Sequence, residues 1–362
     1  MKDLSAMSTA ELKAYLSECE TKRDQFNTVQ HSTKILLNSL YGALGTPYFR
    51  MYDICQATGI TLSGQAVVSK SYEVMNDFIN GMLKVNRDWV VASDTDSAYV
   101  NFSQLMKSLV DGVPVEKHVD VLQKICDEVL SKRLTAKFDA FAKDTNSMRN
   151  AVDMKRESIA SACFVAKKNY VMNVYDNEGT RYAHPKQKIT GLEAIKSSTP
   201  EYFRKKLTAG YQLVFTGTQA EVFKFIKAVH TEYMSLPIEE IAATTSVTEL
   251  DKYIDGDGFA SGTPGHVKAA VTYNKQIIKL GLTTKYVPIR AGDKIKIINL
   301  KEPNPLRVAY FAYLDKFPHE IVQQKYIDRE QNYEKYFVKP IMRVFGVVGW
   351  KHEEVASLDD FF

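Results

Sequence analysis

Trp89-Val-Val-Ala-Ser-Asp94-Thr-Asp96-Ser-Ala-Tyr-Val-Asn-Phe102 consists of two short apolar runs that close on a polar turn. This pattern predicts a β-hairpin with the carboxylates of Asp94 and Asp96 at its tip. A buried scaffold would hold both carboxylates while their oxygens stay accessible, as Mg²⁺ shared with phosphates requires. An isolated Asp-x-Asp is equally consistent with an Asx turn beside a solvated carboxylate, so the rest of the chain must decide.

Composition describes an ordinary globular chain. It has 362 residues, of which 45% are hydrophobic, enough for a sizeable core in two or three subdomains. It shows no signal peptide, no internal repeat and no apolar run of bilayer length, so we expect a soluble, intracellular protein with no membrane partner. Four widely spaced cysteines support neither a zinc site nor a disulfide framework and are expected to be reduced and mostly buried: Cys19, Cys55, Cys126 and Cys163.

The positive charge is local. The whole chain carries a formal charge of +4, but Lys155–Lys206 holds eleven Lys/Arg against five Asp/Glu, a net of +6, which leaves −2 for the remainder. A surface that follows a phosphate backbone needs such a concentration of cations.

Three long helices are expected before Lys155, two of them before the hairpin and one after it. Ser8-Thr-Ala-Glu11 is a capping box that starts a helix at about Thr9, and this helix ends at Gly42–Pro47. A second helix runs from Tyr52 to about Phe78 and should lie under the hairpin. A third, from about Val115 to Ala142, appears structural because its apolar residues recur at helical spacing.

One face of the first helix carries a cation, an amide and an aromatic ring. Lys34, Asn38 and Tyr41 fall at i, i+4 and i+7. An ammonium, an amide and a ring suit a nucleoside triphosphate, which offers phosphates, polar groups and a base or sugar. The competing interpretation is a solvated lysine beside a core tyrosine.

Two strands meet at a pair of lysines. Lys155–Val165 and Tyr170–Tyr175 are predicted strands, the second ending in a turn at Asp176-Asn-Glu-Gly179. Lys167-Lys-Asn-Tyr170 between them suits a grip on a nucleic-acid backbone, although lysines also protect edge strands. Lys186–Pro200 is read as a loop whose Lys196, Ser197 and Ser198 contact phosphates.

Beyond Pro200 the chain is expected to be mostly helical. Ala220–Met234 is the clearest helix, Lys294–Asn299 a short strand, and His319–Met342 a second helical tract. The final residues form an acidic tail with one aliphatic and two aromatic side chains, which is typical of a docking peptide: Leu358, Phe361 and Phe362.

Taken together, three motifs resemble those of family B replicative DNA polymerases. Lys34-Ile-Leu-Leu-Asn38-Ser-Leu-Tyr41-Gly42 resembles the fingers motif K-x-x-x-N-S-x-Y-G, Ser93–Ser97 the palm motif D-T-D-S, and Lys167–Tyr170 the primer-binding motif K-K-x-Y. They occur in the family's order, and Gly191–Pro200 with the Phe-rich end is most similar to polymerases of tailed bacteriophages. Two residues depart from the pattern, Ser93 where Gly is common and Asn169 where Arg is usual.

The resemblance implies an α+β fold that forms part of a polymerase right hand, with fingers helices, an incomplete antiparallel palm sheet and a mostly helical thumb. The implied divisions are a second part of the fingers at 1–47, a palm at 48–199, a thumb at 200–350 and a flexible clamp-docking tail at 351–362. Neither D-x-x-S-L-Y-P-S, which supplies the other palm aspartate, nor the D-x-E of a proofreading exonuclease in its usual surroundings occurs. The chain begins with Met1 near the fingers tip, so it resembles the C-terminal half of a polymerase split between two polypeptides.

Site roles follow from the same resemblance. Asp96 and Asp94 would hold two Mg²⁺ ions, shared with the palm aspartate of an N-terminal subunit that also carries the exonuclease, and Glu157 would neighbour them. Lys34, Asn38, Tyr41 and Gly42 would bind the incoming deoxynucleoside triphosphate. Primer-template DNA would contact six residues: Lys167, Lys168, Tyr170, Lys196, Ser197 and Ser198. A sliding clamp would bind the tail through Leu358, Phe361 and Phe362. The implied location is the cytoplasm of an infected bacterial host.

Two other classes remain open. A non-catalytic DNA-binding accessory or processivity subunit could retain the motifs, and it would bind DNA without needing Asp96. A different Mg²⁺-dependent transferase could carry an Asp-x-Asp hairpin, but it would have no use for the Lys34, Asn38 and Tyr41 helix.

Overall fold

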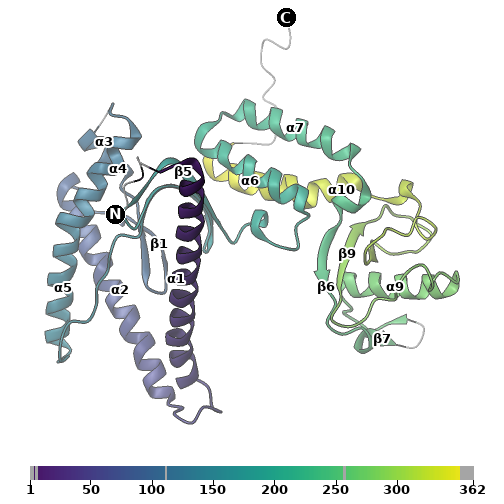
Figure 1. Ribbon diagram of the computed structural model, residues 1–362, viewed down its shortest axis with the longest axis horizontal. Coiled ribbons are helices and arrows are strands. Elements are labelled where there is room, and N and C mark those ends of the chain that lie inside the picture. The colour runs from purple at the N-terminus through teal and green to yellow at the C-terminus, as the bar shows by residue number, and fades with distance from the viewer. Residues whose placement is uncertain (1–3, 5–6, 111, 256–257, 351–362) are drawn as a thin grey trace, which may run out of the picture. The chain divides into compact units, whose positions relative to one another are not determined.

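The computed structural model describes residues 4, 7–110, 112–255 and 258–350. It forms two compact units, the first comprising residues 1–112 and 124–155 and the second residues 113–123 and 156–362. Helices and small antiparallel sheets are mixed in the chain, as an α+β fold requires (Figure 1). The unit boundaries differ from the predicted divisions at 47 and 199, and the names fingers, palm and thumb stay predictions.

The first unit is built on two long helices. Its elements are α1 (Thr9–Leu44), α2 (Ile54–Leu83), β1 (Val90–Asp94), β2 (Ser97–Val100), α3 (Ser103–Val110), a π-helical turn (Ile125–Leu130) and α5 (Ser131–Asp144). The predicted capping box is confirmed, because the Ser8 side chain accepts from the Glu11 N–H while Glu11 accepts from the Ser8 N–H. Helix α1 ends at Leu44, within the predicted break, and none of its residues is buried.

The β1–β2 hairpin is attached to the C-terminal end of α2 through a small core. Trp89 is 3% exposed and packs in a cluster with Phe78, Ile79, Leu105 and Leu130. This confirms that α2 lies under the hairpin. A two-stranded hairpin is only marginally stable by itself, so this support decides where its tip is held.

Two asparagines of α2 complete the attachment through hydrogen bonds. Asn80 Oδ1 accepts from the Trp89 indole N–H at 2.8 Å, and Asn76 Oδ1 accepts from the Trp89 backbone N–H at 2.8 Å. The Asp88 carboxylate accepts from the Val90 N–H and from Asn76, and these bonds hold the pKa of Asp88 below its ordinary value. Every polar group of Trp89 therefore has a partner, which burial of the ring requires.

The second unit contains two three-stranded antiparallel sheets and a group of packed helices. Its elements are α4 (Val115–Lys124, most of it in this unit), β3 (Ser158–Ala166), β4 (Asn169–Asn177), β5 (Thr180–Thr190), α6 (Glu201–Thr216), α7 (Gln219–Ser235), α8 (Ile238–Ile241), β6 (Ala243–Ser246), β7 (Ile254–Asp255), β8 (Gly258–Phe259), α9 (Gly265–Lys279), β9 (Lys294–Asn299), β10 (Tyr310–Tyr313), α10 (Arg329–Tyr333) and α11 (Lys339–Phe345). The strand orders are β3-β4-β5 and β10-β9-β6.

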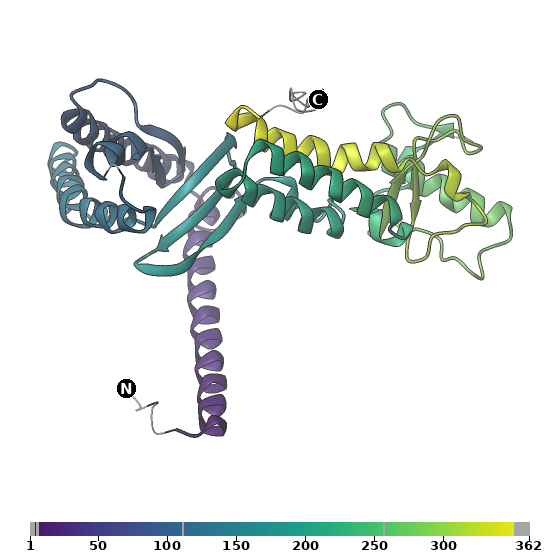
Figure 2. The same cartoon turned by 90° about the horizontal axis from the view of Figure 1, so that it is seen from above.

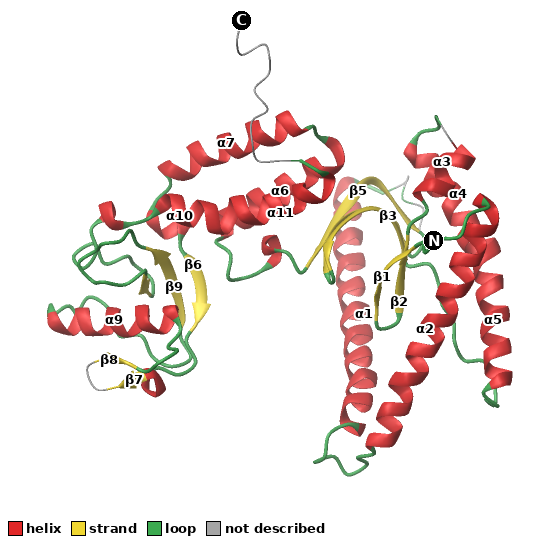
Figure 3. Ribbon diagram, turned by 180° about the vertical axis from the view of Figure 1, so that it is seen from behind, coloured by secondary structure: helices red, strands yellow, loops and turns green. Residues whose placement is uncertain are grey.

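Aromatic side chains join the helices of this unit. Helices α6 and α7 lie beside the α10–α11 run, drawn yellow in Figure 2, and Phe203 of α6 sits 4.7 Å from Tyr233 and 5.9 Å from Phe337 between ring centroids. Helix α9 lies beside β10 and β9 (Figure 3), and Tyr273 of α9 packs on Phe311. The predicted helix at 220–234 and strand at Lys294–Asn299 are confirmed as α7 and β9.

Two sequence predictions are wrong in the β3-β4-β5 sheet. Lys186–Thr190, predicted to be loop, is the last part of β5, where Lys186 and Lys188 pair with Val174 and Met172. Asp176, predicted to be a turn residue, lies within β4 and is 1% exposed. The last two residues of the predicted turn, Glu178 and Gly179, do form the turn between β4 and β5, with φ angles of 50° and 84°.

The predicted helical tract from His319 to Met342 is also too long. Turns and a short 3₁₀ helix, Gln324–Tyr326, occupy its first ten residues, and α10 begins only at Arg329. Residues 200–350 also contain the β10-β9-β6 sheet, of which only β9 was predicted. In the first unit, the predicted helix from Val115 to Ala142 is interrupted by the π-helical turn at Ile125–Leu130, which shifts the helical register.

Cysteine burial differs from expectation. Cys19 and Cys55 are exposed, Cys126 is half-buried and only Cys163 is buried, and none of these four cysteines forms a disulfide. Within the described part of the chain, no helix combines the length and apolar character needed to cross a membrane.

The Trp89 attachment is tested by Asn80→Ala in a Trp350→Phe background, where Trp89 is the only tryptophan. The substitution removes three hydrogen bonds and leaves the buried indole N–H without a partner, so the free energy of unfolding should fall by about 2–3 kcal/mol. Urea unfolding followed by Trp89 fluorescence measures this loss. Asn27→Ala on exposed α1 is the control, and equal effects of the two substitutions would contradict the role of Asn80.

Candidate functional site

The hairpin presents two carboxylates at a two-residue turn. Asp94 pairs with Ser97, and Thr95 between them adopts φ 56°, which allows the tight reversal. The Asp96 N–H donates to the Asp94 backbone oxygen at 2.7 Å, and the Ser97 hydroxyl donates to the same oxygen at 3.1 Å. The backbone oxygen of Asp94 therefore accepts both of these bonds.

The donor chemistry of this tip fits a hard cation. Asp96 is exposed, whereas Asp94 is half-buried and accepts from the Thr95 hydroxyl at 3.3 Å. Carboxylate oxygens are the ligands that Mg²⁺ prefers, and it commonly completes its shell with water and substrate phosphates. Among the described residues, no group of three or more His, Cys, Asp or Glu side chains could enclose a metal by itself. The hairpin can thus contribute two carboxylates to a metal site.

The cation, amide and ring predicted on the first helix do share a face of α1. Lys34 and Asn38 are exposed, and Tyr41 is 45% exposed. The Tyr41 hydroxyl lies 2.6 Å from the Thr61 hydroxyl of α2, whose own hydrogen is directed to the Ala57 carbonyl, so Tyr41 donates. This bond fixes the ring against α2 while Lys34 and Asn38 remain accessible.

Space for a ligand exists at the end of the same face. A side chain added at Gly42 would meet no atom within 4 Å, so the backbone there can be approached closely. The predicted nucleotide-binding residues are therefore collected on one accessible helix face.

Glu157 belongs to the second unit and lies one residue before β3, where it is exposed. Its backbone oxygen accepts from the Glu178 N–H at 2.6 Å, which holds it against the β4–β5 turn. Beside it, Arg156 forms a 2.5 Å ion pair with Asp176. Burial alone would raise the pKa of Asp176, but Arg156 and the Gly179 N–H stabilise the anion and hold that pKa below its ordinary value.

The paired lysines occupy the tip of the β3–β4 hairpin. Ala166 pairs with Asn169, so Lys167 and Lys168 form the turn, and both side chains are exposed. Tyr170 is 7% exposed and packs 5.2 Å from Phe164 between ring centroids. In this unit Tyr170 supports the turn from within the sheet, and the two ammonium groups are the accessible part of the motif.

Gly191 joins this turn to the segment that follows β5. Both Lys168 and Gly191 have positive φ, 61° and 70°. A Cβ atom at Gly191 would lie 2.1 Å from the Lys168 carbonyl oxygen and 2.4 Å from Asn169 Oδ1, so only glycine allows the two backbones to approach this closely. The start of the segment that carries Lys196, Ser197 and Ser198 is thus held against the Lys168 turn.

The segment from Gly191 to Pro200 is an ordered turn structure. Glu193–Ile195 forms a 3₁₀ turn, and Thr199 is buried. The Thr244 hydroxyl of β6 donates to the Ser197 backbone oxygen at 2.7 Å. Lys196, Ser197 and Ser198 are all exposed on this fixed backbone.

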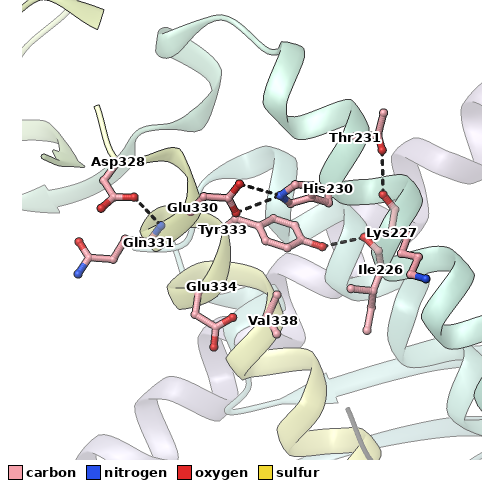
Figure 4. Close-up of a pocket in the computed structure, with 10 residues that line it drawn as sticks. All are labelled: Ile226, Lys227, His230, Thr231, Asp328, Glu330, Gln331, Tyr333, Glu334 and Val338. Atoms are coloured by element: carbon pink, nitrogen blue, oxygen red, sulfur yellow. Dashed lines mark hydrogen bonds and ion pairs between the residues drawn. The ribbon is translucent and has the colours of Figure 1, made fainter. Parts of the chain in front are cut away.

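A pocket between α7 and α10 is lined by no predicted site residue (Figure 4). The His230 ring meets the Glu330 carboxylate at 3.0 Å and the edge of Tyr333 at a centroid distance of 4.8 Å. The Tyr333 hydroxyl donates to the Ile226 backbone oxygen at 2.7 Å. These contacts join the two helices, and we assign the pocket no role in the candidate site.

Sequence reasoning missed the residues that support the site. The spacing of Asn76 and Asn80 at i, i+4 beside Trp89 was the available signal for the hairpin attachment. Asp176 had no local signal, because its partners Arg156 and Arg181 become neighbours only when the sheet forms. The predicted clamp-binding residues Leu358, Phe361 and Phe362 lie outside the described residues.

The chain is similar to known DNA polymerases. A family model, DNA polymerase family B, matches residues 7–329. The DNA-directed DNA polymerases of Enterobacteria phage T4 and Escherichia phage RB69 are each 30% identical to the chain over 380 residues, covering 100% of it and 42% and 41% of their own lengths. DNA polymerase 1 of Sulfurisphaera ohwakuensis is 24% identical over 351 residues, covering 94% of the chain and 32% of its own length. The chain therefore spans about two fifths of the phage proteins it matches.

The close approach at Gly191 is tested against Gly179, which has a similar positive φ of 84° but no atom within 4 Å of an added Cβ. Gly179→Ala should lower the free energy of unfolding by about 1–2 kcal/mol, the ordinary cost of a left-handed alanine. Gly191→Ala should cost clearly more, because it also separates the segment from the Lys168 turn. Urea unfolding compares the two, and equal losses would show that the contact adds nothing beyond backbone strain.

Proposed function

The chain belongs to DNA polymerase family B, and from that premise we propose that it supplies part of the active site of a DNA-directed DNA polymerase that replicates viral DNA. The observation that carries this proposal is the Asp94–Asp96 hairpin, with accessible carboxylates on a support built by Trp89 and α2. The hairpin lies within residues 7–329, the part of the chain that matches the family model.

The chemistry would be in-line nucleotidyl transfer from a deoxynucleoside triphosphate to a primer 3′-hydroxyl. Two Mg²⁺ ions, when bound, would neutralise the phosphates and orient the attacking and leaving oxygens. Asp96 and Asp94 would hold these ions, with Glu157 as an acidic neighbour. Positioning and charge neutralisation would provide most of the rate enhancement.

Residues of α1 would bind the incoming nucleotide. The Lys34 ammonium would pair with the triphosphate, and Asn38 would hydrogen-bond within the pocket. Tyr41, held by Thr61, and the open backbone at Gly42 would line the nascent base pair. The orientation of Tyr41 thus depends on α2, which also carries the hairpin support.

The second unit would hold the primer-template. Lys167 and Lys168 at a hairpin tip, and Lys196, Ser197 and Ser198 beyond Gly191, present ammonium and hydroxyl groups suited to phosphate oxygens. Because these groups contact the backbone and not base edges, binding should be independent of sequence and sensitive to salt.

The remaining part of the active site would come from a complementary N-terminal polymerase subunit, which carries the first palm aspartate and the exonuclease. The hairpin contributes the two carboxylates Asp94 and Asp96, and D-x-x-S-L-Y-P-S, which supplies the family's other palm aspartate, is absent from these 362 residues. Helix α1 supports this proposal, since large apolar side chains lie on it with more than half of their surface exposed: Phe26, Val29, Leu36, Leu37 and Leu40. Such a surface is typical of one that another polypeptide covers.

The acidic tail would tether the enzyme to a sliding clamp in the cytoplasm of the infected bacterial host. Leu358, Phe361 and Phe362 would enter an apolar pocket of the clamp. So short a peptide binds weakly by itself, but tethering raises processivity through effective concentration.

Asp96→Asn is the direct test of the proposed catalysis. In the enzyme assembled with its complementary segment, incorporation should fall by more than about a hundredfold, because an amide cannot replace the carboxylate charge at the ions. Primer-template affinity should remain nearly unchanged. Single-nucleotide incorporation is measured beside Asp77→Asn, an exposed control on α2. Activity of the Asp96 variant within tenfold of the parent would exclude this role, and no incorporation by the parent would favour the accessory-subunit alternative.

Lys34→Ala and Lys168→Ala separate the two basic surfaces. The first should mainly raise the apparent KM for nucleotide, whereas the second should weaken primer-template binding and flatten its salt dependence. Steady-state kinetics and fluorescence anisotropy distinguish these effects, with Lys13→Ala on the exposed face of α1 as a charge control. Exchanged phenotypes would show that the two assignments are reversed.

A further inference from the structure

One carboxylate in the Gly191–Pro200 segment is shared by two cations. Glu193 Oε1 lies 3.3 Å from Lys196 Nζ and 3.1 Å from Arg343 Nη2. Lys196 was predicted from sequence to contact phosphates. Arg343 lies 150 residues further along the chain, on α11, and no motif includes it.

The three side chains differ in exposure. Glu193 is 18% exposed, whereas Lys196 and Arg343 are 46% and 49% exposed. The carboxylate thus lies on the inner side of the group, and the cations lie on the outer side. One negative charge cannot neutralise two positive ones, so the outer surface keeps a net positive charge where an anion can approach.

Both cations stand on fixed backbone. Arg343 belongs to α11, whose Ile341, Val344 and Phe345 are buried in the core of the second unit. The segment carrying Lys196 is fixed by Gly191 and by the Thr244 bond to Ser197. A shared carboxylate between two rigid elements sets the spacing of the cations before any ligand binds.

The guanidinium adds chemistry that lysine lacks. It carries five N–H donors in a planar fork, so a bond from Nη2 to Glu193 leaves further donors for a phosphate group. The neighbouring Ser197 and Ser198 are exposed on the same segment as Lys196. Arginine, lysine and hydroxyl groups together are the usual partners of a nucleic-acid phosphate.

We propose that Arg343 is a further DNA-binding residue, which contacts a backbone phosphate of the primer-template together with Lys196, and that Glu193 positions both cations. This inference rests on the proposed function, because it assumes that the second unit binds DNA. It adds a contact from the C-terminal helix to a surface that the sequence motifs placed only on residues 167–198.

A purely structural ion pair between α11 and the segment makes a different prediction. In that case loss of Arg343 would lower stability without changing the salt dependence of DNA binding. A phosphate contact releases counterions when it forms, so losing it changes the slope of log Kd against log salt concentration.

The test compares Arg343→Gln, which keeps an N–H for Glu193 but removes the charge, with Arg343→Lys, which keeps the charge. Fluorescence anisotropy of a dye-labelled primer-template, from about 50 to 200 mM salt, measures Kd for the 362-residue chain. Arg343→Gln should raise Kd several-fold and reduce the salt slope by about 0.9, the value for one lost phosphate contact. Arg343→Lys should restore most of the slope.

Two reference variants separate the possible failures. Lys168→Ala reports on the proposed DNA-binding surface, and Arg149→Ala, an exposed arginine of the first unit, reports the effect of one lost charge. If Lys168→Ala reduces the slope and Arg343→Gln does not, Arg343 is structural and the inference is overturned while the proposed function stands. If neither changes the slope, the proposed DNA-binding surface itself is wrong. Circular dichroism verifies that each variant is folded, and an equal effect of Arg149→Ala would also overturn the inference.

Discussion

The buried indole of Trp89, hydrogen-bonded to Asn80 of α2, fixes the strand pair that carries Asp94 and Asp96. A two-stranded hairpin has too little buried surface to hold a defined position alone. Because Asn76 and Asn80 satisfy the polar groups of Trp89, the ring can be buried without loss, and the short strands gain a rigid base. The same helix also receives the Tyr41 hydroxyl, so the proposed metal-binding and nucleotide-binding residues of the first unit depend on α2.

The second unit solves a different problem, which is to hold several cations close together. Glycine at 191 allows two turns to touch, and the shared carboxylate of Glu193 offsets part of the repulsion between Lys196 and Arg343. At the other end of β4, beside the β4–β5 turn, Asp176 pairs with the buried Arg156 within the sheet. Positive charge therefore remains at the surface because the compensating carboxylates lie further inside.

The local sequence correctly predicted the elements that depend on interactions between residues close together in the chain. The Ser8–Glu11 capping box located the start of α1, and the polar turn at Asp94–Asp96 located the hairpin. The end of β5 was missed because Lys186 and Lys188 give it the composition of a loop. Its strand conformation depends on pairing with β4, which the local sequence does not reveal. The tract after His319 was assigned to helix although turns fill it as far as Asp328. Arg343 could not be found from sequence, since its partner Glu193 is distant along the chain and no periodic pattern relates them.

The carboxylate set remains the central constraint. Two-metal transfer needs acidic oxygens around both ions, and the hairpin supplies the carboxylates of Asp94 and Asp96. The most direct measurement is primer extension by the purified 362-residue chain with Mg²⁺ and all four deoxynucleotides, with and without a second polypeptide that carries the first palm motif. We expect no extension by the chain alone and Asp96-dependent extension when the second polypeptide is added. Robust, Asp96-dependent synthesis by the chain alone would contradict the account.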